Sequence, residues 1–385
     1  MADILINKTG CKHYQKGISM KKQIFFFIGT EAEFIKLFPV IIECQRMQGI
    51  CHIISSGQND LKKSRIIDCI KLNGKFIELS KEDFIKKNAV GLFTWFVQTR
   101  LKAVKQIYNE FPEEDFTNVP FVVHGDTVST FMGACIGKKL GALVCHVEAG
   151  LRSHHLFNPF PEEIDRLLTS RLARVHFAPG KEAENNLAKV KGEIINTEYN
   201  TILDSLNYSK SIPTEMKEIS SITLQDYFVF VMHRQENLAN REFVRNVLEE
   251  VKVLAQNKKC VLILHKITEN VLEELGQLQE LKRNDSFVLL PRVDYFDFMK
   301  LLQSAQFVIT DGGSNQEELC YMGKPCLIMR KTTERTEGLG KNAILYDGNI
   351  RSIQKFALDY ERYQSGTSIN KSFPSQIIAR NLINR

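Results

Sequence analysis

The sequence predicts an α/β protein built from two units of the Rossmann type. Short, continuous apolar runs at residues 23–28 and 226–232 are typical of strands buried inside a sheet. The first run leads through a glycine turn into helical apolar spacing over residues 31–48, which together make a strand–turn–helix unit. A third run, residues 307–310, enters a glycine-rich turn in the same way. The 385 residues are enough for two domains with separate cores.

Composition and charge exclude several classes of protein. The hydrophobic fraction of 43% and the charged fraction of 25% are ordinary for a globular chain. The net charge of +6 is mild and the basic residues are spread out, so we expect no nucleic-acid partner. No run of 18 apolar residues occurs, so we expect no transmembrane helix and no membrane partner. A mild positive balance suits an anionic small molecule.

The cysteines indicate a reducing compartment. Nine are scattered along the chain without a CxxC pair, which favours the cytoplasm and argues against a zinc site. Cys135, Cys145, Cys260 and Cys326 lie in apolar segments and are most simply core residues. Residues 1–19 lack the apolar core of a signal peptide, and we expect them to be an extension before the first strand.

The remaining elements of the first unit follow in alternation. Strand-type runs are expected at residues 52–54, 121–123, 143–145 and 173–178, and helices at residues 89–110 and 181–191. In the second unit, strands are expected at residues 261–264 and 287–290, and a last helix at residues 374–385. Asp204, in the segment between the units, is expected to cap the linker helix.

Acidic side chains follow two successive strands of the first unit. Asp126 and Glu148 come just after these strands, and Glu162 follows in a third acidic cluster. Ligands of open α/β sheets bind beyond the carboxyl ends of the strands, so the three carboxylates could serve acid–base chemistry in one cleft. Ordinary helix capping explains each of them equally well. Spacing alone leaves both interpretations open.

The second unit carries a phosphate-type turn. Gly312, Gly313 and Ser314 join a strand to a helix, where free backbone N–H groups and the helix dipole favour an anion. His233 ends the first strand of this unit, a position that is more often structural than functional. Phe298 is equally compatible with core packing and with a ligand contact.

Long motifs resemble one known family. HGDT at residues 124–127, HVEAGLRS at residues 146–153 and PFPEEIDR at residues 159–166 resemble the non-hydrolysing UDP-N-acetylglucosamine 2-epimerases, and the resemblance extends from about residue 24 to residue 345. It implies a GT-B fold, in which two Rossmann-like domains face each other across a cleft. The expected bounds are residues 20–200 and 201–370, with the helix at residues 374–385 crossing back to the first domain.

The resemblance also implies roles for individual residues. Asp126, Glu148 and Glu162 would share acid–base and positioning work, and His233 would stabilise or protonate the phosphate side of the substrate. The substrate-binding set implied in this way is Lys36, Gly312, Gly313, Ser314 and Arg335 for the diphosphate, Glu318 for the ribose and Phe298 for the uracil. Glu317, next to Glu318, is expected to face away from the ribose. No metal and no cofactor are implied.

One motif departs from the family pattern. The family has Gly-Thr-Arg-Pro-Glu after the first strand, where the arginine helps to hold the diphosphate, and this chain has Glu31 in place of that arginine. At ~4 Å and an effective dielectric constant near 20, each pair of unit charges is worth about 4 kcal/mol. Glu31 is therefore expected to turn away, to pair with Lys36 or another cation, or to mark a different ligand. Arg335 is the candidate to supply the lost charge.

The function implied is interconversion of UDP-GlcNAc and UDP-ManNAc by elimination and re-addition of UDP, in support of bacterial surface polysaccharide synthesis. The alternatives are an epimerase that hydrolyses its product to ManNAc and UDP, a GT-B enzyme for another nucleotide sugar, and a non-catalytic sensor. The retained carboxylates and His233 argue against a sensor. The expected partners are a UDP-sugar and a second copy of the chain in a homodimer. A regulatory UDP-sugar site is doubtful, because the residues after Gln58 differ from the family.

Overall fold

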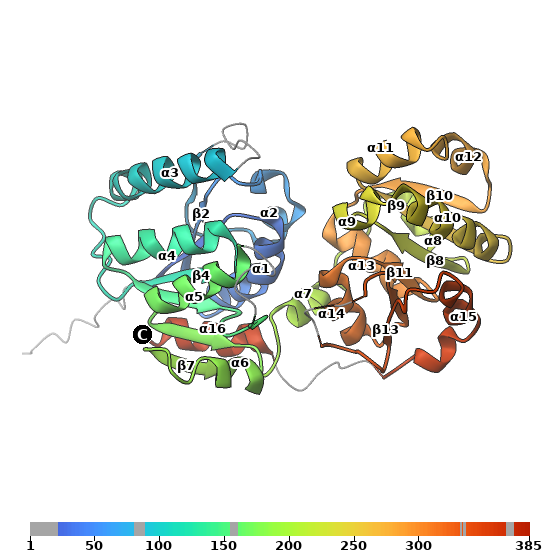
Figure 1. Ribbon diagram of the computed structural model, residues 1–385. Coiled ribbons are helices and arrows are strands. Elements are labelled where there is room, and N and C mark those ends of the chain that lie inside the picture. The colour runs from blue at the N-terminus through green and yellow to red at the C-terminus, as the bar shows by residue number, and fades with distance from the viewer. Residues whose placement is uncertain (1–21, 81–88, 155–160, 332, 334–335, 367–372) are drawn as a thin grey trace, which may run out of the picture.

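Two parallel sheets, each flanked by helices, form the two lobes of the molecule (Figure 1). The computed structural model describes residues 22–80, 89–154, 161–331, 333, 336–366 and 373–385. Helix α7 (Ile202–Ser209) lies between the lobes. The predicted α/β class with two Rossmann-like units is therefore confirmed.

Within the described residues, the first sheet has seven strands in the order β3-β2-β1-β4-β5-β6-β7. They are β1 (Gln23–Ile28), β2 (Ile50–Ser55), β3 (Phe76–Glu78), β4 (Pro120–His124), β5 (Leu143–Val147), β6 (Val175–Ala178) and β7 (Glu193–Asn196). The order reverses between β1 and β4, which is where ligands bind in such sheets. Asp126 and Glu148 follow β4 and β5, directly beside this point.

Helices cover both faces of the first sheet. They are α1 (Glu31–Arg46), α2 (Arg65–Ile70), α3 (Ala89–Glu110), α4 (Val128–Leu140), α5 (Glu162–Leu172) and α6 (Lys181–Asn186), with a 3₁₀ turn η1 (Leu61–Lys63). The predicted helix at residues 181–191 is too long. It stops at Asn186 because the chain must turn at Gly192, with φ of 127°, to enter β7 beside β6.

The second sheet, counted over the described residues, has six strands in the order β10-β9-β8-β11-β12-β13. They are β8 (Tyr227–Val231), β9 (Lys259–Leu264), β10 (Phe287–Pro291), β11 (Val308–Thr310), β12 (Cys326–Ile328) and β13 (Ala343–Leu345). Its helices are α8 (Lys217–Ile222), α9 (Gln235–Ala239), α10 (Arg241–Ala255), α11 (Lys266–Glu274), α12 (Leu278–Arg283), α13 (Tyr295–Ser304), α14 (Gly313–Met322), α15 (Ser352–Leu358) and the turn η3 (Tyr360–Tyr363).

The apolar run of β1 is continuous because both faces of the strand are covered. Phe26 packs in one core with residues of α1, whereas Phe25 and Phe27 pack in another with residues of α3 and α4. Successive side chains of a strand point to opposite faces, so one strand supplies both cores. Cys145, Cys260 and Cys326 are fully buried as expected, while Cys135 is only half-buried.

The last helix, α16 (Pro374–Ile383), returns to the first unit. Ile378, Ala379 and Leu382 are fully buried in the core that α1 also enters. The prediction that Asp204 caps the linker helix is wrong. Asp204 lies inside α7, and its Oδ2 accepts a hydrogen bond of 2.7 Å from the backbone N–H of Ser375, so it caps α16 instead. Two helices far apart in sequence are joined by this contact.

No helix among the described residues is long and apolar enough to cross a membrane. No group of three or more His, Cys, Asp or Glu side chains among them is placed to hold a metal ion.

Candidate functional site

A cleft of about 760 Å³ opens at the carboxyl ends of the strands of both sheets. Five of the site residues predicted from sequence line it, and all come from the second unit: His233, Phe298, Gly312, Gly313 and Glu318. The first unit contributes Glu31 and the loop that follows β2. The predicted carboxylates are outside this lining, on the neighbouring turns after β4 and β5.

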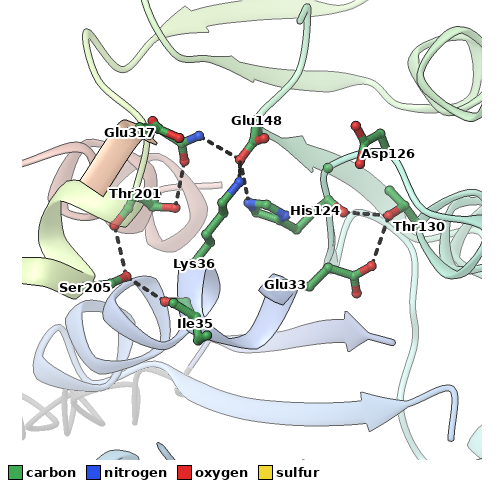
Figure 2. Close-up of polar contacts among 12 residues, drawn as sticks. Glu33, Ile35, Lys36, His124, Asp126, Thr130, Glu148, Thr201, Ser205 and Glu317 are labelled. Atoms are coloured by element: carbon green, nitrogen blue, oxygen red, sulfur yellow. Dashed lines mark hydrogen bonds and ion pairs between the residues drawn. The ribbon is translucent and has the colours of Figure 1, made fainter. Parts of the chain in front are cut away.

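Glu148 is the centre of a buried polar cluster at the end of β5. Its Oε2 lies 2.5 Å from Lys36 Nζ and accepts a hydrogen bond of 2.7 Å from Asn200 Nδ2. His124 Nε2 lies 3.3 Å from the same oxygen. Figure 2 shows Lys36 and His124 converging on Glu148, with Asp126 to one side. The Glu148 side chain is only 5% exposed, so these partners replace the water that burial removes from its carboxylate.

The backbone of Glu148 is itself unusual. Its φ is 61°, in the left-handed region that residues other than glycine rarely adopt. Such strain is typical of functional sites, where the surrounding contacts hold the side chain in place. Lys36, expected at the diphosphate, instead neutralises Glu148 in this structure and is absent from the cleft lining. Its contact with the diphosphate stays a prediction.

Asp126 is held by an arginine that the sequence did not single out. Arg166, on α5, forms an ion pair with Asp126 Oδ2, and its Nη1 lies 3.2 Å from Glu163 Oε2. Glu163 in turn accepts a hydrogen bond of 3.0 Å from the backbone N–H of Ser153. One arginine therefore joins the turn after β4 to α5.

Two further carboxyls lie in the first turn of α5. Glu162 Oε2 and Asp165 Oδ2 are buried and have no hydrogen-bond partner among the described residues. Burial, together with the charges of Asp126 and Glu162, raises the pKa of Asp165 to about 7. At neutral pH, Asp165 is thus available as a proton donor beside two of the predicted acid–base residues.

Asp165→Asn is expected to stabilise the protein more at pH 8 than at pH 5. The folded state binds more protons than the unfolded state between the ordinary pKa of aspartate and about 7, so wild-type stability falls as pH rises through this window. We expect the gain at pH 8 to exceed that at pH 5 by about 1 kcal/mol, or roughly 2 °C in melting temperature. Thermal melts of both proteins at the two pH values test this. Equal gains would contradict it.

Glu33 holds the turns after β1 and β4 together. It is 3% exposed, and one of its oxygens accepts a hydrogen bond of 2.6 Å from the N–H of Gly29. The other accepts one of 2.5 Å from Thr127 Oγ1. Burial raises the pKa of Glu33, and these hydrogen bonds oppose the shift. Glu33 matches the last residue of the family's Gly-Thr-Arg-Pro-Glu. It joins the turn before α1, the helix of Lys36, to the turn that carries Asp126.

His233 is fixed by a buried aspartate at the end of β11. Its Nδ1 lies 3.1 Å from Asp311 Oδ1, and its backbone N–H donates to the same carboxylate at 3.0 Å. Asp311 is fully buried and also accepts from the backbone N–H of Arg234 and from Asn237 Nδ2. Burial alone would raise the pKa of Asp311, but the hydrogen bonds from His233 and Arg234 lower it overall. The ring of His233 stacks on His265, with centroids 4.6 Å apart.

At the turn after β11, Gly312 lies close to the side chains of Asn315 and His233. A Cβ at Gly312 would lie 2.3 Å from Asn315 Oδ1 and 3.1 Å from the ring of His233, so a larger residue there would have to displace the Asn315 side chain. Gly313 begins α14, and Ser314 follows within it. Phe298 lines the cleft and also packs against the core, which unites both interpretations of that residue.

The two neighbouring glutamates of α14 lie in different surroundings. Glu318 lines the cleft, whereas Glu317 is buried outside the lining and accepts a hydrogen bond of 3.2 Å from Tyr321 Oη. Arg335, the candidate for the lost charge, is outside the described residues. Its role stays a prediction.

Glu31 lines the cleft, but it does not pair with Lys36, so that expectation is wrong. Its Oε1 accepts a hydrogen bond of 2.6 Å from Ser64 Oγ at the start of α2, and Lys36 is occupied by Glu148. Burial raises the pKa of Glu31, and the hydrogen bond from Ser64 and the charge of Arg292 oppose this shift. The turn after β1 therefore presents a carboxylate to the cleft.

Comparison with known proteins identifies similar chains. A family model described as UDP-N-acetylglucosamine 2-epimerase matches residues 107–359. The chain is 31% identical to a UDP-N-acetylglucosamine 2-epimerase of Methanocaldococcus jannaschii, over 86% of this chain and 90% of the relative. It is 27% identical to that of Bacillus subtilis, over 94% and 95%. The crystal structure of the M. jannaschii enzyme with UDP-GlcNAc and UDP is similar, with a TM-score of 0.74 and 27% identity, over 94% of this chain and 100% of that one.

Proposed function

Because the chain belongs to the UDP-N-acetylglucosamine 2-epimerase family, we propose that it interconverts UDP-GlcNAc and UDP-ManNAc. One observation carries the proposal. The glycine turn beside His233 lines the cleft, and the carboxylates that follow β4 and β5 lie on the neighbouring turns, just outside that lining. A sugar bound with its diphosphate on the glycine turn would present its ring to the carboxylates.

The reaction that fits these groups is an elimination followed by an addition. A base removes the C2 proton while the C1–O bond to UDP breaks, and the C1=C2 double bond forms. UDP then adds back to C1, and a proton is delivered to the opposite face of C2. Glu148 and Asp126, which are paired with Lys36 and Arg166, are the proposed bases. Asp165, whose pKa is raised to about 7, is the proposed proton donor.

His233 supports the departure of the diphosphate in this scheme. Asp311 holds its Nδ1 side, which leaves the opposite side of the ring for a phosphate oxygen in the cleft. The backbone N–H groups at the start of α14 lie at the same edge and favour negative charge there. The negative charge that develops on UDP as the C1–O bond breaks would thus be stabilised.

We further propose that the enzyme retains UDP through the second step, so that no free sugar is released. Its UDP-ManNAc would feed bacterial surface polysaccharide synthesis. Four further points stay predictions: a homodimer, a cytoplasmic location, the stated domain bounds and the doubtful regulatory site.

Proton NMR of the purified protein with UDP-GlcNAc in D2O tests the proposal. We expect a manno product with deuterium at C2 and no accumulation of free sugar. Free UDP together with released ManNAc would support the hydrolysing reaction instead. Absence of both exchange and product would overturn the assignment to UDP-GlcNAc and favour another nucleotide sugar.

A further inference from the structure

The cleft contains four permanently charged cations, and one of them differs from the rest. Lys63, Arg65, Arg234 and Arg292 line the cavity. Lys63 pairs with Asp60 at 2.8 Å, Arg65 with Glu215 at 2.9 Å and Asp294 at 3.0 Å, and Arg234 with Glu236 at 2.6 Å. Arg292 makes no ion pair within 4.0 Å with any residue that the structure describes.

The position of Arg292 is that of a ligand-binding group. It follows β10 directly, at the same edge of the second sheet as the glycine turn and His233. Its side chain is exposed in the cleft, so its guanidinium keeps all five N–H donors available. An exposed arginine with no carboxylate beside it is well suited to bind an anion in two-point geometry.

The charge of Arg292 acts on two other residues that line the cleft, Glu31 and His265. Its charge acts across the cleft on Glu31, where it opposes the rise in pKa caused by burial. It acts on His265 too, whose pKa is lowered to about 4 mainly by burial and further by His233 and Arg292. Because His265 stacks on His233, Arg292 lies near the proposed phosphate side of the substrate.

The surroundings of Glu31 explain why a cation is needed in the second unit. Glu31 is tied to Ser64 and cannot attract a diphosphate, so the turn after β1 offers no positive side chain at this position. A nucleoside diphosphate sugar carries about two negative charges that must be balanced in the cleft.

We propose that Arg292 binds the diphosphate of the nucleotide sugar and takes over, from the opposite side of the cleft, the work of the arginine that Glu31 replaces. This inference rests on the proposed function. In this arrangement, the diphosphate pairs with Arg292 of the second unit, while Glu31 stays bound to Ser64 in the first.

Calorimetric titration with UDP and with uridine tests the proposal. Arg292→Ala is expected to weaken UDP binding about 10- to 100-fold, because a bidentate charged contact is lost. Binding of uridine, which has no phosphate, is expected to change less than about twofold. Arg292→Lys should give an intermediate loss, since a lysine keeps the charge but not the planar fork. Lys63→Ala, another exposed cation of the same cleft, is the matched control and should change UDP affinity less than about threefold.

The double variant Glu31→Arg, Arg292→Ala is the sharper test. Returning an arginine to the turn after β1 is expected to restore UDP affinity to within about threefold of wild type. An unchanged UDP affinity in Arg292→Ala, or an equal loss for uridine, would overturn the inference. Wild-type protein that binds no UDP would instead overturn the proposed function, and the inference with it. Melting temperatures of all variants show that any loss is not a folding defect.

Discussion

Glu148→Gln is expected to lower kcat at least about 1,000-fold, the upper part of the range for loss of an acid–base group. The change removes the charge without changing the volume, so the substrate can still enter. It also leaves Lys36, whose side chain is 11% exposed, without its carboxylate partner. UDP affinity should stay within about threefold of wild type, because Glu148 is outside the cleft lining that holds the glycine turn. Product formation by NMR and calorimetric titration with UDP measure the two effects separately.

Two controls separate chemistry from stability in this experiment. Glu182→Gln, an exposed glutamate on α6, should leave kcat unchanged. The double variant Lys36→Met, Glu148→Gln removes both buried charges and should recover most of the melting temperature lost by Glu148→Gln, because an unpaired buried charge is the costly state. It should not recover kcat. A single variant that keeps more than about a tenth of wild-type kcat would show that Glu148 performs no acid–base step.

Much of the fold could be predicted because the strands are apolar throughout. In a parallel sheet covered on both faces, each strand must be hydrophobic on both sides, which makes runs such as that of β1 stand out. Helix ends were less predictable, because they depend on where the next strand must begin. The end of α6 is set by the turn at Gly192 into β7, and no local signal marks it.

The candidate site was predictable as a set of residues and not as a set of contacts. The family resemblance indicated Asp126, Glu148 and His233, but the residues that pair with them or orient them were not predicted as their partners. Lys36 is 112 positions from Glu148, and Arg166 is 40 positions from Asp126. Only the folded chain brings these pairs together.

Some residues missed by sequence reasoning carried a weak signal. Asp311 directly follows a strand, and Asp126 also comes just after one. The same pattern could therefore have indicated Asp311. Asn200 lies at the expected boundary between the two domains, and it donates a hydrogen bond to Glu148. The raised pKa of Asp165 had no signal in the sequence, since it arises from burial and from the charges of Asp126 and Glu162.

The second large effect is expected at Asp311. Asp311→Ala removes the acceptor for the backbone N–H groups of His233 and Arg234 and for Asn237 Nδ2, all at 3.0–3.1 Å. Buried donors left without an acceptor are costly, so we expect a loss of about 2–4 kcal/mol in the free energy of unfolding. We also expect kcat to fall about 100-fold, because the ring of His233 is no longer held at the phosphate side. Urea denaturation and initial rates measure these two effects.

A comparison with His233→Ala decides whether Asp311 acts through the histidine. If it does, the double variant should have nearly the kcat of His233→Ala alone, since two residues that act as one unit are not additive. Asp311→Asn, which keeps one acceptor oxygen, should retain more stability than Asp311→Ala. Asp226→Ala, an exposed aspartate just before β8, controls for loss of a carboxylate in the same unit. Fully additive losses in kcat would contradict the positioning role and leave Asp311 as a purely structural support of the turn after β8.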